Sequence, residues 1–582
     1  MPKVLSPQLY RANSTWKGRQ WTLSASTGNI PEMLASLGKD NLQNKTIIHL
    51  LLLITLGGAL FFCKVSTLPL TDPDEARCGL IVRDMIRNHH WLIPHLESKP
   101  YFDKPAPFFW LAAVVQKITG DEESPGRIIA GLFALAAVLI TYAAARSIFN
   151  LLAGLLAGVI LITTGEFLYI ARWYRMDMPF AASMWAGLWL FLRAEIKRQN
   201  EHKYKGGWIG FYLFCAIATL FKGPAGLLLP ALTVAIYLLL SGKPRRFFEL
   251  FNLKGIILYL LISAPWYVAI SLKEPHYAYE FFIRQNIARY TTSTFGHTRW
   301  PAVIYIPILL AGLMPWTIYL PGICIRYFPR RWSKRNNSPA ILFLWLAVLV
   351  PLIFFSLSKT KLMNYILPLF PPLAVMIGGL IAGWVLSSKP DSLMMHGARA
   401  AFIMVLLLPL APASIEIWLG NVDYWIFIPV AASAICAGLM WKSLSQHDRG
   451  RFIRWEVAAV IIMFLFAIGH TAPAGFDKMS WRSLVKQAES AIRPHRSNAR
   501  FYYRSCKIES IMFYLDIDKI EKIAKVNGSI IPAMRNIFKS PQPCFCFIGK
   551  QKYFDEIKRA FPGKFILLAQ YGQRYIIASR LR

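Results

Sequence analysis

Acidic and basic residues gather in short polar segments that separate long apolar runs of the sequence. The first such segment holds Asp74, Glu75 and Arg77. Carboxylates and cations beside apolar runs are costly unless they are hydrated or paired. Together they suit an acid–base or orienting group beside a phosphate-binding group. The alternative is a solvated loop that caps a helix, because Pro73 and Asp74 also suit a helix start.

Four further polar segments repeat this combination of charges. Their chemically capable residues are Tyr101, Asp103 and Lys104; Arg175 and Asp177; His276, Glu280, Arg284, Arg289, Tyr290 and His297; and Lys359, Lys361 and Tyr365. If these segments converge on one membrane face, the cations can hold phosphate. A carboxylate can act as a base or steer an acceptor. The pattern therefore fits an active site for a phosphate-bearing lipid.

Composition defines the setting of these segments. The chain has 582 residues, of which 55% are hydrophobic and 16% charged, with mean hydropathy +0.40. Soluble domains contain about 25% charged residues. The composition excludes an ordinary soluble enzyme, a disordered chain and a disulfide-rich secreted scaffold. A net charge of +34 would suit a nucleic-acid binder, but such a protein is not mostly apolar helix.

The apolar runs predict a polytopic helical membrane protein, because a spanning helix needs about 20 apolar residues. We expect about thirteen spans, at 46–65, 126–149, 151–170, 178–196, 207–222, 225–241, 254–272, 301–323, 338–357, 365–387, 400–419, 423–441 and 455–471. The apolar stretch 106–118 is short for a span. We expect it to be an interfacial helix.

Basic loops decide the orientation. With 106–118 on the surface, every dense cluster of Lys and Arg falls on one side, which the positive-inside rule makes cytoplasmic. The expected domains are a cytoplasmic tail at 1–45, a membrane domain at 46–474 with outer loops 66–125 and 273–300, and an outer domain at 475–582. The acidic and basic candidates then lie on the outer face.

The C-terminal part predicts a small soluble α/β domain. Short strand-like runs stand at 499–506, 509–515, 543–549 and 564–579, with helical stretches at 480–492 and 551–560. A disulfide from Cys506 to Cys544 or Cys546 would suit an oxidising compartment. The Cys-x-Cys spacing is a weak signal for a metal.

Four motifs, taken in order, resemble a known family. They are Asp74-Glu75-x-Arg77, Tyr101-Phe102-Asp103-Lys104-Pro105, Arg175-Met176-Asp177-Met178, and Ser358-Lys359-x-Lys361-Leu362-x-x-Tyr365-x-Leu367-Pro368. The chain resembles GT-C membrane glycosyltransferases related to protein O-mannosyltransferases, and most closely the bacterial lipid A 4-amino-4-deoxy-L-arabinose transferases. The resemblance implies a GT-C bundle with juxtamembrane helices and a periplasmic α/β domain.

The resemblance also implies roles for residues. Asp74 and Asp177 would be the catalytic aspartates, with Glu75 in support. Phosphate would be held by Lys104, Arg289 and Tyr365, with support from Arg77, Tyr101 and Lys361. Arg175 and Lys359 complete the candidate cations. Asp103 stands where this family more often has Glu, and it could hold a divalent metal such as zinc with His276, His297 or Glu280; no nucleotide cofactor is implied.

The implied reaction moves aminoarabinose from undecaprenyl phosphate to a lipid A phosphate with inversion, which gives resistance to polymyxin. The implied place is the bacterial inner membrane, with the active site facing the periplasm, and we expect a monomer that binds no nucleic acid. A mannosyltransferase-like enzyme acting on a protein hydroxyl is the alternative. A lipid transporter is a third reading, although transporters usually carry charges near the midplane and show repeats.

Overall fold

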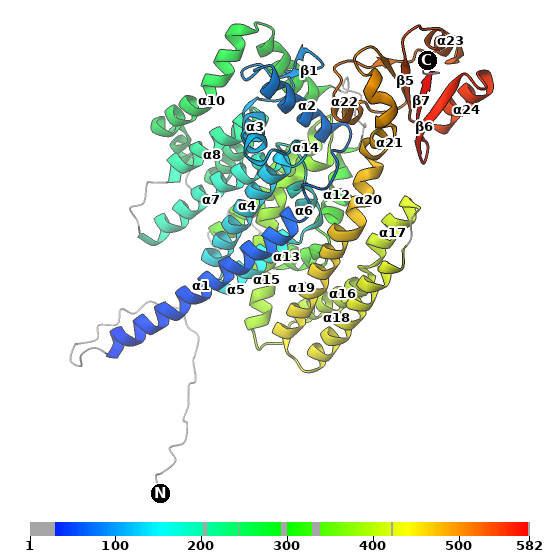
Figure 1. Cartoon of the computed structure of the whole chain (residues 1–582). Coiled ribbons are helices and arrows are strands. Elements are labelled where there is room, and N and C mark those ends of the chain that lie inside the picture. Colours follow the sequence, from blue (N-terminus) through cyan, green and yellow to red (C-terminus); the bar gives the residue numbers. More distant parts are fainter. Residues whose placement is uncertain are drawn as a thin grey trace. The chain divides into compact units, whose positions relative to one another are not determined.

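A computed structural model describes residues 30–201, 207–241, 244–292, 300–328, 338–420 and 423–579. The chain forms two compact units, Met1–His49 and Leu50–Arg582. The first unit holds only the beginning of helix α1, Ile30–Phe62. The second unit is a helical bundle that continues into a small mixed sheet, coloured orange to red in Figure 1.

All thirteen apolar segments expected to span the membrane coincide with helices. The bundle consists of α1, α4 (Pro125–Ile148), α5 (Leu151–Ile162), α6 (Gly165–Ala171), α7 (Asp177–Glu201), α8 (Gly207–Lys222), α9 (Ala225–Leu240), α10 (Leu253–Lys273), α12 (Tyr305–Gly312), α13 (Leu320–Tyr327), α14 (Pro339–Leu357), α15 (Phe370–Leu386), α16 (Ser392–Leu407), α17 (Leu410–Leu419), α18 (Phe427–Ser445) and α19 (Arg449–Phe466). In the described ranges, eight helices are long and apolar enough to cross a membrane, or ten if two bent pairs each count as one span. Helices α8 and α9 are shorter. The chain is a multi-pass membrane protein, and the exact number of thirteen stays a prediction.

The bent pairs explain part of this difference. Helices α5 and α6 meet at 66°, and the pair made by α12 and α13 bends by 109°. Each pair covers one of the expected spans. A continuous apolar run in the sequence does not reveal such a break.

The first long loop is a folded layer. It holds α2 (Asp74–Arg87), the hairpin of β1 (His95–Leu96) with β2 (Lys99–Pro100), and α3 (Pro107–Thr119). Helix α3 matches the expected interfacial helix in its bounds. Pro107 occupies its first position, and Gly120 ends it with φ of 71°. Phe108 and Phe109 are buried, whereas Val114 and Ile118 are exposed.

The C-terminal sheet has the strand order β4-β3-β5-β7-β6. The strands are β3 (Arg500–Arg504), β4 (Glu521–Lys522), β5 (Cys544–Ile548), β6 (Phe565–Tyr571) and β7 (Arg574–Ser579), with β5 parallel to β3 and antiparallel to β7. Side chains alternate along β5: Phe545 and Phe547 join one core, and Cys544 and Cys546 join another. Both faces are therefore covered, by α21 (Arg482–Ile492) and α22 (Glu509–Leu515) on one side and by α23 (Ile531–Phe538) and α24 (Gln551–Ala560) on the other.

Two expectations about this domain were wrong. The run 509–515 is helix α22, because its apolar residues Ile511, Met512 and Leu515 repeat with a helical period and bury one face. The run 564–579 is a hairpin of two strands, β6 and β7. The sequence left a disulfide from Cys506 to Cys544 or Cys546 open; all eight cysteines lie in the described ranges and are free thiols.

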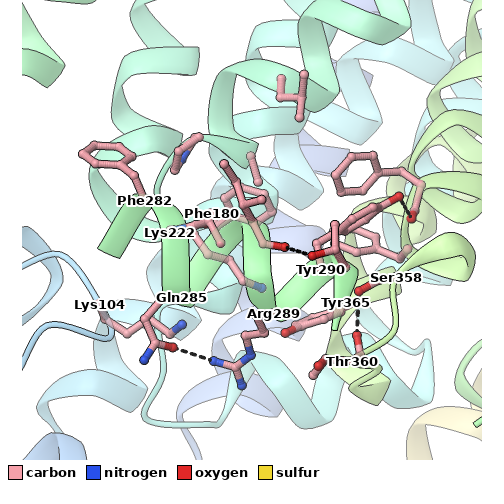
Figure 2. A pocket seen from close by; sticks show the side chains of 18 residues that line it. Lys104, Phe180, Lys222, Phe282, Gln285, Arg289, Tyr290, Ser358, Thr360 and Tyr365 are labelled. Carbon is pink, nitrogen blue, oxygen red and sulfur yellow. Dashed lines mark hydrogen bonds between the residues drawn. The ribbon is translucent and has the colours of Figure 1, made fainter. Parts of the chain in front are cut away.

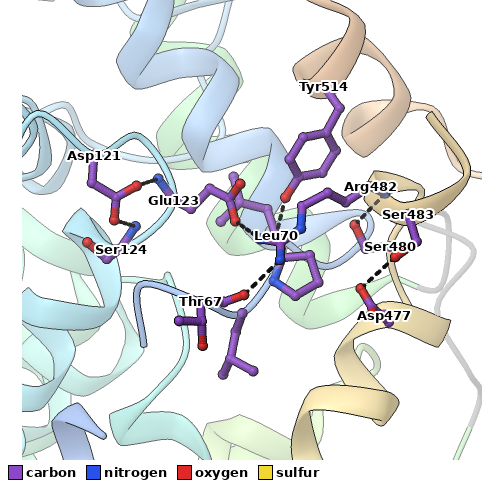
Figure 3. A network of polar contacts seen from close by, with 12 residues as sticks. Thr67, Leu70, Asp121, Glu123, Ser124, Asp477, Ser480, Arg482, Ser483 and Tyr514 are labelled. Atoms are coloured by element: carbon purple, nitrogen blue, oxygen red, sulfur yellow. Dashed lines mark hydrogen bonds and ion pairs between the residues drawn. The ribbon is translucent and has the colours of Figure 1, made fainter. Parts of the chain in front are cut away.

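Polar contacts join the C-terminal domain to the first loop. Arg482 pairs with Glu123 at 2.6 Å, and the Tyr514 hydroxyl accepts a hydrogen bond from the Leu70 amide at 2.7 Å (Figure 3). Asp72 accepts hydrogen bonds from the amide and hydroxyl of Ser510. Burial raises the pKa of Asp72 to about 6. The domain is therefore fixed against the same loop that carries Asp74.

Candidate active site

A chain of alternating charges crosses a cavity of about 180 Å³ at one end of the bundle. Lys222 Nζ lies 2.5 Å from Asp177, and Asp177 lies 3.2 Å from Arg175 Nε. Arg175 Nη1 in turn lies 2.9 Å from Asp74. Asp74 is 3.8 Å from Arg77. Each carboxylate therefore has a cationic partner at a place where isolated charges would be costly.

Helix termini place these groups. Asp74 begins α2 and Asp177 begins α7, where the helix dipole favours an acid. Lys222 ends α8, where the dipole favours a cation. Gly223 follows with φ of 87°, and an added Cβ would meet Phe281 at 2.8 Å. Only glycine therefore allows the chain to turn immediately after Lys222.

The two aspartates differ in exposure. The side chain of Asp177 is 2% exposed and is held between two cations, whereas that of Asp74 is 32% exposed. Asp177 is therefore suited to fixing Lys222 and Arg175. Asp74 is the aspartate that a ligand can reach from solvent.

Glu75 points into the protein, away from this cavity. Its carboxylate is fully buried and accepts hydrogen bonds from Arg127 Nε at 2.8 Å and Nη2 at 2.7 Å. Thr71 and the Tyr174 amide also donate to it. Successive helical residues point about 100° apart, so the helix that presents Asp74 to the cavity turns Glu75 inward. Its geometry is that of an anchor for α2.

A second, larger cavity of about 400 Å³ adjoins the first (Figure 2). Its walls are mainly apolar and come from Phe180, Pro224, Ala225, Leu228, Phe282, Ile287, Phe354 and Phe355. Five residues line both cavities: Lys104, Lys222, Gln285, Arg289 and Tyr365. Three of them are cationic side chains, so an anionic group at the junction would be reached from both cavities.

An irregular helix supplies part of this junction. The π-helical segment η2 (Tyr279–Ala288) leads into α11 (Arg289–Thr291), and such segments are frequent at functional sites. Gln285 Nε2 donates to Asp103 at 2.8 Å and to Glu280 at 3.3 Å. The side-chain oxygen of Gln285, Oε1, accepts a hydrogen bond from Arg289 at 3.4 Å.

These contacts bear on the expected metal ligands. Asp103 and Glu280 share an amide donor, and Glu280 also pairs with Arg284 at 3.0 Å. His276 is exposed at the turn before η2. Within the described part of the chain, these three residues do not form a group of metal-binding atoms within 4.8 Å of one another. His297 lies outside the described residues.

Lys104 is the most perturbed cation in the outer loops. Burial and then the charge of Arg289 lower its pKa to about 7. Burial also raises the pKa of the neighbouring Tyr101 phenol, which keeps it protonated. Lys104 is therefore poised so that an incoming anion would favour its charged form.

Most predicted site residues converge, but Glu75, Lys359, Lys361, His276 and Glu280 are not among the described residues that line the two cavities. Asp74, Arg77, Tyr101, Asp103, Lys104, Arg175, Asp177, Arg289 and Tyr365 all line the smaller cavity. Lys359 is exposed, and Lys361 donates to the Ser358 carbonyl at 2.5 Å. Neither lysine, nor Glu75, is among the described residues that line the two cavities. The loop reaches the site through Ser358, Thr360 and Leu362 instead.

Sequence reasoning missed three residues of the site: Lys222, Gln285 and Cys78. Lys222 ends the predicted span 207–222 and is not among the site residues predicted from the sequence. Its signal was its position directly before Gly223-Pro224, at the end of a span on the side where basic residues are sparse. Gln285 and Cys78 carry no charge and gave no comparable signal.

The fold and the charged site define a class: multi-pass membrane proteins of the GT-C type. The structure of ArnT from Cupriavidus metallidurans bound to undecaprenyl phosphate superposes with a TM-score of 0.72 over 91% of this chain and 97% of that one, at 18% identity. Residues 103–268 match the family of dolichyl-phosphate-mannose-protein mannosyltransferases. The fold class expected from the sequence is confirmed.

Curated relatives are more specific. The undecaprenyl phosphate-alpha-4-amino-4-deoxy-L-arabinose arabinosyl transferase 1 of Pseudomonas fluorescens is 32% identical over 56% of this chain and 58% of its own length. The corresponding transferase of Pectobacterium carotovorum is 29% identical over 76% of this chain and 80% of its own length. The chain thus spans between just over half and four fifths of the length of these relatives, and it is similar to aminoarabinose transferases.

Proposed function

We propose that this protein is a membrane glycosyltransferase that moves 4-amino-4-deoxy-L-arabinose from undecaprenyl phosphate to a lipid A phosphate. The observation that carries the proposal is the junction of the two cavities. Lys104, Lys222 and Arg289 stand where an apolar cavity meets a cavity lined by carboxylates. A polyprenyl phosphate has the matching order of parts: an apolar chain, an anionic phosphate and a polar sugar.

The chemistry follows from this arrangement. The acceptor oxygen attacks the sugar C1 while the bond to the polyprenyl phosphate breaks, with inversion. The leaving phosphate gains negative charge, and the cations at the junction stabilise it in the transition state. Tyr365 closes the junction, with its ring 5.0 Å from Lys222 Nζ.

Asp74 lines the smaller, polar cavity, where the proposed sugar and acceptor would lie. A lipid A phosphate is largely ionised at neutral pH and needs little deprotonation, since the second pKa of a phosphate monoester is about 6. Asp74 therefore serves to orient the acceptor or the cationic amine of the sugar. Its exposure and its pairing with Arg175 and Arg77 suit this positioning role.

The test is transfer of aminoarabinose by purified protein in lipid vesicles. We expect Asp74→Asn to lower the rate by about 100-fold, the scale of a loss of correct positioning. Glu97→Gln is the matched control, because Glu97 is an exposed acid of the same outer loop that lines neither cavity among the described residues. Full activity of Asp74→Asn would contradict the role of Asp74.

The match to protein mannosyltransferases over 103–268 supports a second candidate, transfer of a sugar to a protein hydroxyl. That reaction needs a base, because a hydroxyl must lose its proton. Mass spectrometry of lipid A from cells with and without the protein separates the two. An aminoarabinose mass on lipid A, together with higher polymyxin tolerance, supports the first; unchanged lipid A with lost protein glycosylation supports the second.

We place the reaction at the periplasmic face of the bacterial inner membrane. The support is the basic excess of the opposite loops and the position of the site on the sparsely basic side. Labelling of a single cysteine introduced at exposed Lys99 by a membrane-impermeant thiol reagent, in a background without the exposed native cysteines, would test this orientation.

A further inference from the structure

A carboxylate and two imidazoles gather at the C-terminal end of α2, outside both cavities. Asp84, His90 and His95 each offer one ligand atom, and these atoms lie within 4.8 Å of one another. Among the described residues, this is the one group of three or more His, Cys, Asp or Glu side chains that meets this geometry. All three residues are half-buried.

Hydrogen bonds already orient the three side chains. Asp84 Oδ2 lies 2.7 Å from His90 Nδ1, and its Oδ1 accepts from Asn88 at 2.7 Å. His95 Nδ1 lies 2.8 Å from the Ile93 carbonyl oxygen. A carbonyl only accepts, so Nδ1 carries the proton and Nε2 of the neutral ring keeps a lone pair. This backbone contact is the arrangement that commonly fixes a metal-binding histidine.

The two rings also lie together. Their centroids are 3.8 Å apart, with an angle of 28° between the planes. Neutral imidazole is the form of histidine that binds metals. Two imidazoles, one carboxylate and an open position for water are a ligand set typical of zinc.

We propose that Asp84, His90 and His95 bind a zinc ion that fastens the β1–β2 hairpin to helix α2. The hairpin leads directly into the loop with Tyr101 and Lys104, and the Tyr101 amide donates to the Pro94 carbonyl at 2.7 Å. The ion thus links two parts of the active site: the helix that begins with Asp74 and the loop that carries Lys104. The proposal does not depend on the sugar or the acceptor of the transfer reaction.

The first experiment measures zinc binding by the full-length protein in detergent, after removal of any histidine tag. Titration with Zn²⁺ alone should give one site in the wild type. His90→Gln and His95→Gln should each weaken binding by more than about 100-fold. His89→Asn is the matched control: it removes the exposed neighbouring imidazole, and asparagine tolerates its φ of 58°. It should bind like the wild type.

A further variant separates this site from the active-site carboxylates. Asp103→Asn should leave zinc binding unchanged. The proposal is overturned if the wild type binds no zinc, or if Asp103→Asn removes binding while His90→Gln and His95→Gln retain it.

The second experiment guards against variants that fail to fold. In the wild type alone, zinc should slow amide hydrogen exchange over residues 90–101 at least about tenfold, because the hairpin must detach from α2 to open. Exchange that is unchanged by zinc in this segment would show that the ion does not fasten the hairpin, and would overturn the proposed role.

Discussion

The two cavities differ in their walls although they share five residues. The larger has mainly apolar walls from α7, α9, η2 and α14, whereas the smaller is lined by carboxylates and guanidinium groups from α2 and the loop before α7. A lipid chain is soluble in the first environment and a sugar or phosphate in the second. If the protein acts as proposed, the shared cations lie at the group that joins the lipid and the sugar of the donor.

The largest effect should come from removing a shared cation. Lys104→Ala should lower kcat/KM for sugar transfer by about 1000-fold, because it withdraws charge from the leaving phosphate. The initial rate with a polyprenyl-linked donor measures this. Lys99→Ala, an exposed change on the neighbouring hairpin, should have no effect. A loss of less than about threefold in Lys104→Ala would show that the junction is not where the phosphate lies.

The pH profile should reveal the same lysine. Since the pKa of Lys104 is lowered to about 7, the free protein carries the charged form below that pH and loses it above. We expect kcat/KM to fall about 50-fold between about pH 7 and pH 9, because this parameter reports groups of the free enzyme. Lys104→Arg should retain the cation and flatten the falling limb; an unchanged limb in that variant would assign it to another group.

A change in the apolar cavity should separate the lipid chain from the sugar. Leu228→Trp places bulk in the larger cavity, and we expect the KM for a long-chain donor to rise about tenfold. A donor with a short chain should be affected little. Leu239→Trp is the control, since Leu239 is an exposed residue of the same helix that is not among the described cavity residues. Equal effects on both donors would mean that the lipid chain lies elsewhere.

The smallest effect should appear in the polar cavity alone. Arg77 Nη2 contacts Glu509 of helix α22 at 2.7 Å, so the C-terminal domain holds one wall of this cavity. Glu509→Gln should lower kcat about fivefold, the scale of a partly exposed ion pair, with the KM of the donor unchanged. Glu521→Gln, an exposed change in the same domain, should leave kcat unchanged. If Glu509→Gln changed the KM of the donor together with kcat, the two cavities would not bind separate parts of the substrates.

Much of the fold was predictable because hydrophobic periodicity and length are local properties. All thirteen apolar segments became helices, and the basic loops gave a consistent orientation. The breaks between α5 and α6 and within the α12–α13 pair were not predictable, since packing decides where a continuous apolar run bends. The error at 509–515 has a similar origin: seven residues rich in β-forming side chains became a helix because one face packs on the sheet.

Charged residues of the site were predictable where they stand in apolar surroundings. They were missed where a charge could also be explained by its place at a helix end. Asp74, Asp177 and Lys104 stood out against apolar surroundings. Lys222 resembled an ordinary residue at a helix end, and only the fold shows that it meets Asp177. The resemblance gave Glu75 a catalytic role, and a sequence does not show which side of a helix faces the cavity. Lys359 and Lys361 lie in a loop outside the described linings of both cavities, because a sequence does not show which residues of a loop point inward.

The Asp74-Glu75 dipeptide has a consequence for how this protein can vary. One peptide bond separates a carboxylate open to the cavity from one fully enclosed by Arg127, Thr71 and the Tyr174 amide. Inserting or deleting a single residue directly after Glu75, inside α2, would rotate both acids by about 100° relative to the buried face that follows and would misplace each acid. Length changes should therefore be forbidden at this turn, whereas the exposed tip of the β1–β2 hairpin at Glu97 and Ser98 should accept them.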